Sequence, residues 1–400
     1  MSSKLKDWSG SLIPGIITLA VVFGPSKMTI TTKLGAEFGY SLLWIVAVAI
    51  FFMAIYTSMA ARIGMATKQS LLNTIQMKWG SKFSAIIGIG IFLVTVSFQA
   101  GNAIGSGVAL AELTNTSTGF WVVLSSAIGI SLLFFRRFYK ILETVMIGIV
   151  ISMLLSFLVT CIVARPSLSE SLAGLRPQVP MGSHGLIIAF IASCFSLVGA
   201  FYQSYLVQER ARNNKSGNEI RDRSLTGILL LGLMSVIVMV CAASVLHVNH
   251  IKVNTAADMG RALTPLFGKK ATMFFLIGLY GASFSSLIGN ATLGGTLLAD
   301  SLGFGSSMDS PKAKSFIALI IIIGATIAIL FGHIPLELIV FAQSITVLIV
   351  PLIGIALFAV SNDATIMGKY KNSTAVNIAA IAGLLLVFIL AGLNIQKLFF

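Results

Sequence analysis

Charged and metal-binding side chains are scarce in this chain of 400 residues. It holds 13 acidic residues, 4 histidines and 3 cysteines, and charged residues make up only 10% of the sequence. Each acidic residue falls in an expected connection or near the end of an apolar segment, which leaves no carboxylate for the middle of a membrane. No nucleophile–base pair or metal cluster appears at a common depth, so we expect neither an enzyme nor a bound cofactor or metal centre.

The cysteines also lack any CxxC spacing. Cys161, Cys194 and Cys241 lie inside apolar runs, where a free thiol behaves as a small buried hydrophobe. The pattern therefore predicts no metal or redox motif built from cysteine.

Long apolar runs are what the chain has in abundance. Hydrophobic residues make up 56% of it, and the mean hydropathy is +0.96. The runs are continuous rather than alternating and about 20 residues long, which predicts an all-α polytopic membrane protein and argues against a β-barrel. We expect one transmembrane domain over residues 1–400 with eleven spans, at 12–36, 41–64, 83–112, 119–135, 141–164, 185–208, 225–247, 270–301, 313–332, 335–360 and 374–396.

The 27 basic residues give a formal net charge of +14. A nucleic-acid surface would need a soluble domain to carry it, and the longest connections are too short for one. With the N-terminus inside, 18 basic residues fall in inner segments and 8 in outer ones, while Lys27 lies within a span. This bias predicts a cytoplasmic N-terminus and an external C-terminus in a plasma membrane, the inner membrane of a bacterium.

The first span is interrupted by Gly24-Pro25-Ser26-Lys27. A Gly-Pro pair breaks the hydrogen-bond ladder of a helix, and irregular backbone at membrane depth is tolerated only where protein buries it or a wet cavity adjoins it. A charge at that depth indicates a functional site by default. The structural alternative is a lysine whose ammonium reaches the inner water along its apolar stem.

The sixth span gathers small and polar residues at its centre, around Ser196, Tyr202 and Gln203. Two irregular helices five spans apart are typical of inverted five-helix repeats, in which paired broken helices form a site at the membrane midplane. We therefore expect a first repeat at 12–164, a second at 185–360 and an additional eleventh helix at 374–396. Packing of small residues between membrane helices is the alternative explanation.

The stretch from Pro25 to Trp44 resembles a known signature. The Nramp divalent-metal transporters carry Asp-Pro-Gly-Asn, followed by Gly-Ala-x-Phe-Gly-Tyr-x-Leu-Leu-Trp, and this chain has Gly-Ala-Glu-Phe-Gly-Tyr-Ser-Leu-Leu-Trp at 35–44. Further matches are Ala164-Arg165-Pro166, the segments 206–210 and 285–290, Gln343, Pro351, and the segment 361–368. The resemblance implies the leucine-transporter-like fold over nearly the whole chain, with broken first and sixth helices.

The functional motifs of that family are absent from the matching positions. Gly24 stands where the family has Asp, and Lys27 where it has the metal-binding Asn. The family's Met-Pro-His in the sixth span falls on residues 196–198, and its third-span acidic residues fall near Ala100 and Ala103. The resemblance therefore predicts the fold and a transport activity but not the metal site.

The expected site is a neutral polar set around one cation. Its candidate substrate- or ion-binding residues are Gly24, Pro25, Ser26, Lys27, Gln99, Asn102, Ser196, Tyr202, Gln203, Ser286, Asn290 and Gln343. Helix ends aimed at the site add positive partial charge, which suits a small anionic or zwitterionic solute. Lys27 is also the candidate coupling residue, because burial disfavours the charged form of a lysine and its proton can then exchange.

The most favoured function is therefore a proton-linked secondary transporter of a small solute. Divalent-cation transport through a non-standard site and a non-transporting membrane sensor are the alternatives. The expected partners are the solute, protons and the lipid bilayer, with no nucleic acid, and no oligomeric state is predicted.

Overall fold

The computed structural model describes residues 23–194, 197–213, 224–332 and 334–399. Nearly all of this chain is helical. The α-helices are α2 Pro25–Phe38, α3 Leu43–Ala66, α4 Leu71–Trp79, α5 Ser81–Thr114, α6 Thr118–Leu132, α7 Arg136–Ala164, α8 Leu168–Ala173, α9 His184–Cys194, α10 Leu197–Asn213, α11 Ser224–Ala242, α12 Ala256–Gly260, α13 Thr264–Phe267, α14 Ala271–Ser301, α15 Pro311–Leu330, α16 Pro335–Thr346, α17 Val350–Ser361, α18 Ala364–Met367 and α19 Thr374–Phe399. A π-helical turn, Ala243–His247, extends α11.

Ten of the eleven expected spans have helical counterparts at nearly the expected bounds, whereas the first, expected over 12–36, is described only from residue 23. Within the described ranges, nine helical segments are long and apolar enough to cross a membrane. The helix α6 is shorter, and α2 has 14 residues. The all-α membrane fold is thus confirmed, whereas the count of eleven full spans is not.

The sixth expected span contains α9 and α10, and the break expected there falls on residues 195–196, which lie outside the described residues. A break that was not expected is found within the described residues. The tenth, expected as one span over 335–360, is instead two helices, α16 and α17, joined by a turn at 347–349. Pro351 explains this second break, because it has no N–H to donate to the carbonyl of Val347.

The first span begins its described helix at the expected break. Gly24 has an extended backbone with φ −77° and ψ −176°, and Pro25 occupies the first helical position of α2. Proline is favoured there because its missing N–H has no partner in the helix anyway. The half of the span before residue 23 lies outside the described residues.

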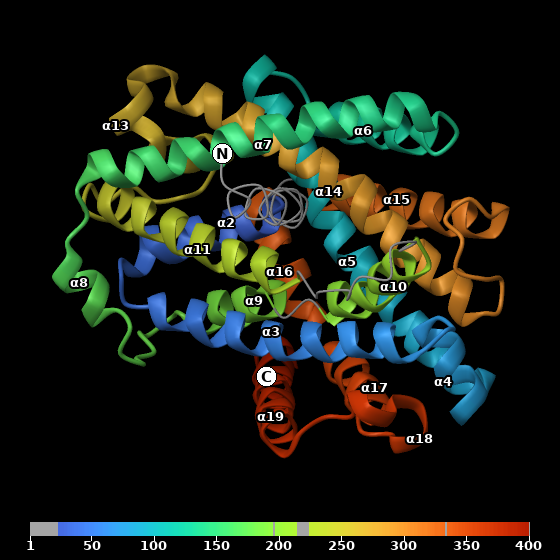
Figure 1. The fold of residues 1–400 in the computed structure, drawn as a ribbon. Coiled ribbons are helices and arrows are strands. Elements are labelled where there is room, and N and C mark those ends of the chain that lie inside the picture. The colour runs from blue at the N-terminus through green and yellow to red at the C-terminus, as the bar shows by residue number, and fades with distance from the viewer. Residues whose placement is uncertain (1–22, 195–196, 214–223, 333, 400) are drawn as a thin grey trace, which may run out of the picture.

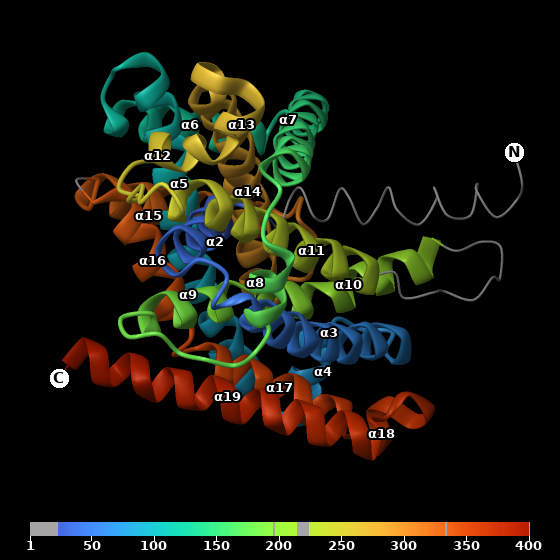
Figure 2. The same ribbon diagram turned by 90° about the vertical axis from the view of Figure 1, so that its left-hand side faces the viewer.

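The interrupted helices lie inside the bundle. The helices α2, α9 and α16 occupy its middle, between α7 on one side and α3 on the other (Figure 1). Around them, α5 packs along α14, α15 and α16, while α2 packs against α11 and α9. The last long helix, α19, runs along the outside beside α17 and α3 (Figure 2). Apolar side chains on α2, α5 and α14 join two buried cores that enclose the middle helices.

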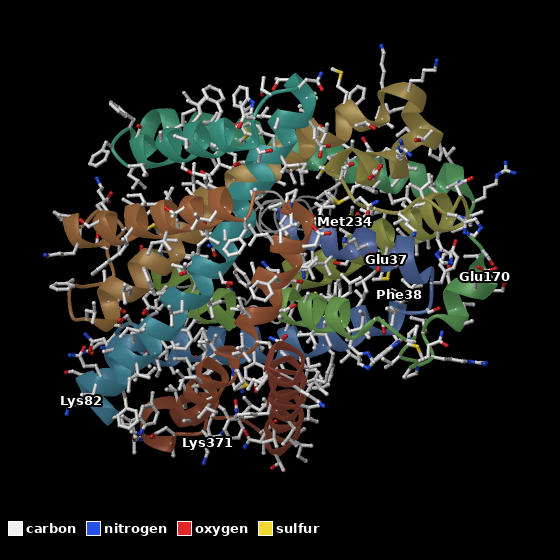
Figure 3. All side chains as sticks on the ribbon, turned by 180° about the vertical axis from the view of Figure 1, so that it is seen from behind. Glu37, Phe38, Lys82, Glu170, Met234 and Lys371 are labelled. Atoms are coloured by element: carbon white, nitrogen blue, oxygen red, sulfur yellow. The ribbon has the colours of Figure 1, made fainter. Side chains whose placement is uncertain are left out.

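The connections lie at opposite ends of the bundle. Lys82, at the start of α5, and Glu170, in α8, are at opposite ends of the molecule (Figure 3). The C-terminal end of α14 lies at the same end as the start of α5, because a Cβ on Gly88 would lie 1.8 Å from Ser301 Oγ. The distribution of basic residues predicts that the end with Lys82 faces the cytoplasm and the end with Glu170 faces the outside.

Candidate functional site

A cavity of about 430 Å³ lies where the broken helices meet α5, α7 and α14. Eight of the twelve expected site residues line it: Gly24, Ser26, Lys27, Asn102, Tyr202, Ser286, Asn290 and Gln343. These residues come from segments far apart in the sequence. The inverted-repeat hypothesis predicts that such segments meet at one site. The volume is in the range of small-molecule sites, roughly 300–1,000 Å³.

Lys27 is buried at the edge of this cavity, with 3% of its surface exposed. Its Nζ donates a hydrogen bond of 2.7 Å to Cys194 Sγ and lies 5.3 Å from the centre of the Phe190 ring. Cys194 is the last described residue before positions 195–196, and its thiol, on α9, accepts this hydrogen bond. Among the described residues, the ammonium thus has a thiol and an aromatic ring face as neighbours.

The start of α2 adds further positive character. No side chain caps this helix, and its first turn holds no acidic residue. The N–H groups of Ser26 and Lys27 have no acceptor within the helix, because only later residues reach a carbonyl four positions back. Ser26 Oγ is buried and has no hydrogen-bond partner among the described residues, although Ser26 lines the cavity.

Close packing shapes the floor of the cavity. Asn102 Nδ2 donates a hydrogen bond of 3.1 Å to the carbonyl of Ser286, which ties α5 to α14. A Cβ on Gly24 would come within 2.7 Å of Ser286 Oγ and 3.7 Å of Asn102 Oδ1. Gly24 therefore lets the backbone approach both polar side chains, where any larger residue would intrude.

The remaining expected site residues are placed differently. Pro25 packs against α5, because a Cβ on Gly105 would lie 2.7 Å from its ring. Gln99 is turned away from the cavity: its Nε2 donates to the carbonyl of Leu287, and its Oε1 accepts from Asn290 Nδ2. Gln203 is half-buried and does not line the cavity, whereas Ser196 lies outside the described residues.

The expectation of a site without a carboxylate is wrong. Glu143 of α7 lines the same cavity as Lys27. The sequence analysis placed it near the inner edge of a span beginning at residue 141, and the apolar stretch of α7 does begin at Ile141. The cavity nevertheless reaches Glu143, because its lining extends along α14 as far as Met308, which the sequence pattern does not reveal.

The cavity extends toward one end of the bundle. From Lys27 it passes Thr292 and Leu293 of α14 and reaches Met308, in the connection between α14 and α15. At the other end, α2 is packed tightly against α11: a Cβ on Gly35 would lie 2.2 Å from the carbonyl oxygen of Met239. Nearby, the His247 ring nitrogen Nδ1 is 2.9 Å from the carbonyl oxygen of Ala36.

Comparison with known proteins identifies the family. The model of natural resistance-associated macrophage protein-like sequences, Nramp, matches residues 15–397. The chain belongs to the Nramp family. The resemblance seen in the sequence is thereby confirmed, and the match extends over nearly the whole chain.

Relatives of this Nramp protein are distant but span its length. A divalent metal cation transporter MntH of Granulibacter bethesdensis is 24% identical, over 100% of this chain and 90% of the relative. An MntH of Deinococcus radiodurans is 25% identical, over 88% of this chain and 81% of the relative. The chain is therefore an integral membrane protein of a transporter family.

Solved structures confirm the fold. A manganese transporter of Eremococcus coleocola superposes with a TM-score of 0.73 at 18% identity, covering 99% of this chain and 87% of that one. Mhp1, a nucleobase-cation-symport-1 family transporter with bromovinylhydantoin bound, superposes with a TM-score of 0.54 at 13% identity, covering 97% of this chain and 93% of that one. The leucine-transporter-like architecture is thus shown for this Nramp member.

Proposed function

We propose that this Nramp protein is a proton-linked secondary transporter of a small organic solute that carries a negative charge. The observation that supports this most directly is the buried Lys27 ammonium at the edge of the cavity, beside an uncapped helix start and a free Ser26 hydroxyl. Backbone N–H groups, a hydroxyl and an ammonium are together the donor set that binds a carboxylate.

Electrostatics favour this proposal over a bare metal ion. A carboxylate about 4 Å from the ammonium gains roughly 4 kcal/mol at an effective dielectric constant of 20, whereas a divalent cation meets a repulsion of about 8 kcal/mol. The cavity is also wide for a dehydrated ion, whose ligand oxygens must lie about 2.0–2.6 Å away. Across the described residues, no group of three or more His, Cys, Asp or Glu side chains is arranged to hold a metal.

The second candidate is divalent-cation transport through a different ligand set. The names of the relatives favour it, and so does the Cys194 thiol beside Lys27, because sulfur binds softer metals. In that case Lys27 must lose its proton before the metal enters, and metal uptake would rise with pH.

The architecture offers a role for Lys27 in coupling. We assign the first repeat to residues 12–164, the second to 185–360 and the eleventh helix to 374–396, which places the cavity between the broken helix of each repeat. The ammonium donates a hydrogen bond to Cys194 of α9, so a change in its protonation would alter an interaction between the two repeats that we assign. A solute carboxylate and a proton would then be bound together.

A thermal-shift screen of the purified protein tests both candidates. We expect organic carboxylates or amino acids to stabilise it, by about 2.7 kcal/mol at a hundred times Kd, and Mn²⁺ and Cd²⁺ at micromolar concentration to have no effect. Lys27→Met should fold but lose the thermal shift caused by ligand. Lys27→Arg should fold but lose proton-dependent uptake, because arginine keeps its proton at all working pH values.

Two results would overturn the proposal. One is a stoichiometric micromolar metal site, measured by calorimetry and lost on mutation of Cys194 or Lys27. The other is a Lys27→Met protein that binds and transports solute like the parent between pH 5 and pH 8, because the lysine would then be structural.

A further inference from the structure

We infer that Glu143 is a specificity-determining residue that binds a cationic group of the solute, and that the transported solute is therefore a zwitterion such as an amino acid. The inference rests on the proposed function, in which Lys27 binds the negative group. It adds the second charge of the solute and the residue that recognises it.

Glu143 is a carboxylate in a membrane-spanning segment. It lies in α7 as the third residue of a 24-residue apolar stretch that begins at Ile141, on the side of the connection between α6 and α7. It is half-buried, and no hydrogen bond or ion pair joins its carboxylate to a described side chain, a set that does not include the side chains of residues 136–140. An acidic residue within a membrane span normally pairs with a cation or faces a pathway.

The described side chains around Glu143 supply no ion-pair partner, and the side chains of residues 136–140 lie outside that description. On one side the carboxylate adjoins a small pocket formed by Leu142, Met146, Phe284, Ser285 and Ile288, which carry no charge. On the other side it lines the cavity of about 430 Å³. A cation bound in that cavity would therefore be its partner.

Lys27 lines the same cavity but does not neutralise Glu143. The Lys27 ammonium contacts Cys194 and Phe190, and no carboxylate of the described residues lies within salt-bridge distance of it. One cavity thus holds a cation and an anion that do not pair with each other. A solute with a carboxylate and an ammonium would neutralise both, whereas a simple anion would leave Glu143 unpaired and repel it.

Two matched ligands separate these cases. L-Proline and cyclopentanecarboxylate share the five-membered ring and the carboxylate, and only proline has the ammonium. The common L-amino acids are first screened for binding. The best binder and its des-amino analogue then form the test pair, and proline with cyclopentanecarboxylate is used if no amino acid binds better than proline. Binding to the purified full-length protein is measured by thermal shift and by calorimetry.

We expect the parent protein to prefer the amino acid over its des-amino analogue by about ten- to hundredfold, the worth of one charge-assisted hydrogen bond. Glu143→Gln should remove this preference while keeping the binding of the des-amino carboxylate, and Glu143→Asp should retain part of it. Lys27→Met should abolish the binding of both.

The control is Glu337→Gln. Glu337 lies in α16 and lines a separate apolar cavity with Ile334 and Phe341, so the substitution makes the same change of charge elsewhere in the membrane region. It should leave both affinities unchanged. A monodisperse elution profile establishes that each variant is folded.

The outcomes separate this inference from the proposed function. If carboxylates bind through Lys27 but no amino acid is preferred, or if Glu143→Gln leaves the preference intact, the inference is wrong and the proposed function stands. If Glu143→Gln instead removes the proton dependence of uptake without changing the preference, Glu143 carries a proton and the inference is also wrong. If no organic solute binds, both fail.

Discussion

Lys27 unites two features that would each be unfavourable alone. A cation in the first turn of α2 opposes the dipole of its own helix, and an ammonium buried in a membrane protein is costly without a partner. The side chain reaches across to α9, where the Cys194 thiol accepts its hydrogen bond and the Phe190 ring faces the ammonium. An acceptor and a cation–π contact together offset part of the cost of burying the charge.

Gly24 offers a test of the cavity floor that leaves every charge in place. Gly24→Ala places a Cβ 2.7 Å from Ser286 Oγ, in the space that a solute carboxylate would need beside Ser26. We expect a folded protein whose affinity for its solute falls at least about tenfold, equivalent to 1.4 kcal/mol. Calorimetric titration of the parent and the variant measures this.

The matched control for that substitution is Gly148→Ala in α7. A Cβ at Gly148 meets nothing within 4 Å, and alanine favours a helix by about 1 kcal/mol over glycine. This variant should bind like the parent and unfold at an equal or higher temperature. Equal affinities for both alanine variants would show that the Gly24 floor takes no part in binding.

Sequence reasoning found Lys27 but not Glu143, for a physical reason. Lys27 follows a Gly-Pro break, which is visible in one short stretch of the chain. Glu143 lies near the start of an apolar stretch, and only the packing of α7 against α14 shows that it lines the same cavity as Lys27. Contacts between such distant segments cannot be predicted from one short stretch of a membrane sequence.

At the scale of elements, the apolar runs predicted the long helices well and their interruptions less well. The break before α2 was expected, whereas the turn between α16 and α17 was not, although Pro351 lies just after it. A proline can kink a membrane helix or divide it, and the sequence does not distinguish these outcomes. The turn after α16 affects the site through one residue: Gln343 lies in the last turn of α16, just before this break, and lines the cavity.

A buried polar cluster joins α10, α14 and α4 at the end where the cavity opens. Tyr205 Oη donates a hydrogen bond of 2.5 Å to Asp300 Oδ2 and accepts one of 3.4 Å from the backbone N–H of Leu72. Asp300 is 4% exposed. Removing the hydroxyl would leave a buried carboxylate without this donor, which costs about 1–3 kcal/mol.

We therefore expect Tyr205→Phe to lower the free energy of unfolding by about that amount, measured by thermal or denaturant unfolding in detergent. Asp300→Asn in the same background should recover part of the loss, because a neutral amide is less costly to bury. Tyr370→Phe is the control, since Tyr370 is half-buried and its ring packs against a hydrophobic core and the Lys369 ammonium, whereas its hydroxyl has no buried carboxylate partner among the described residues. A Tyr205→Phe protein as stable as the parent would show that the cluster does not hold these helices together.

At the scale of the whole molecule, the fold was more predictable than the chemistry. Apolar runs, their order and the signature at 35–44 are spread along the chain and tolerate many substitutions, so they indicate the architecture even at 24% identity to a relative. In the proposed function the solute depends on a few side chains in one cavity, and at two of those positions, Gly24 and Lys27, this chain departs from the motif that it resembles. A few substitutions at one site would change the solute without changing the fold, so the architecture alone does not predict the solute.

The orientation of the bundle decides which side of the membrane the cavity faces. The cavity reaches Met308, in the connection that the charge bias assigns to the cytoplasm. Lys68, in the connection between α3 and α4, is expected on that same side, and Arg176, after α8, on the outside; both residues are exposed.

Single cysteines at these two positions test the assignment. A membrane-impermeant maleimide should label Arg176→Cys in intact cells, whereas Lys68→Cys should react only after the cells are permeabilised. The parent chain gives the background, because two of its cysteines are buried and Cys161 is half-buried. The reverse pattern would place the N-terminus outside and make the cavity outward-facing, so that a solute would first enter this conformation from the external medium.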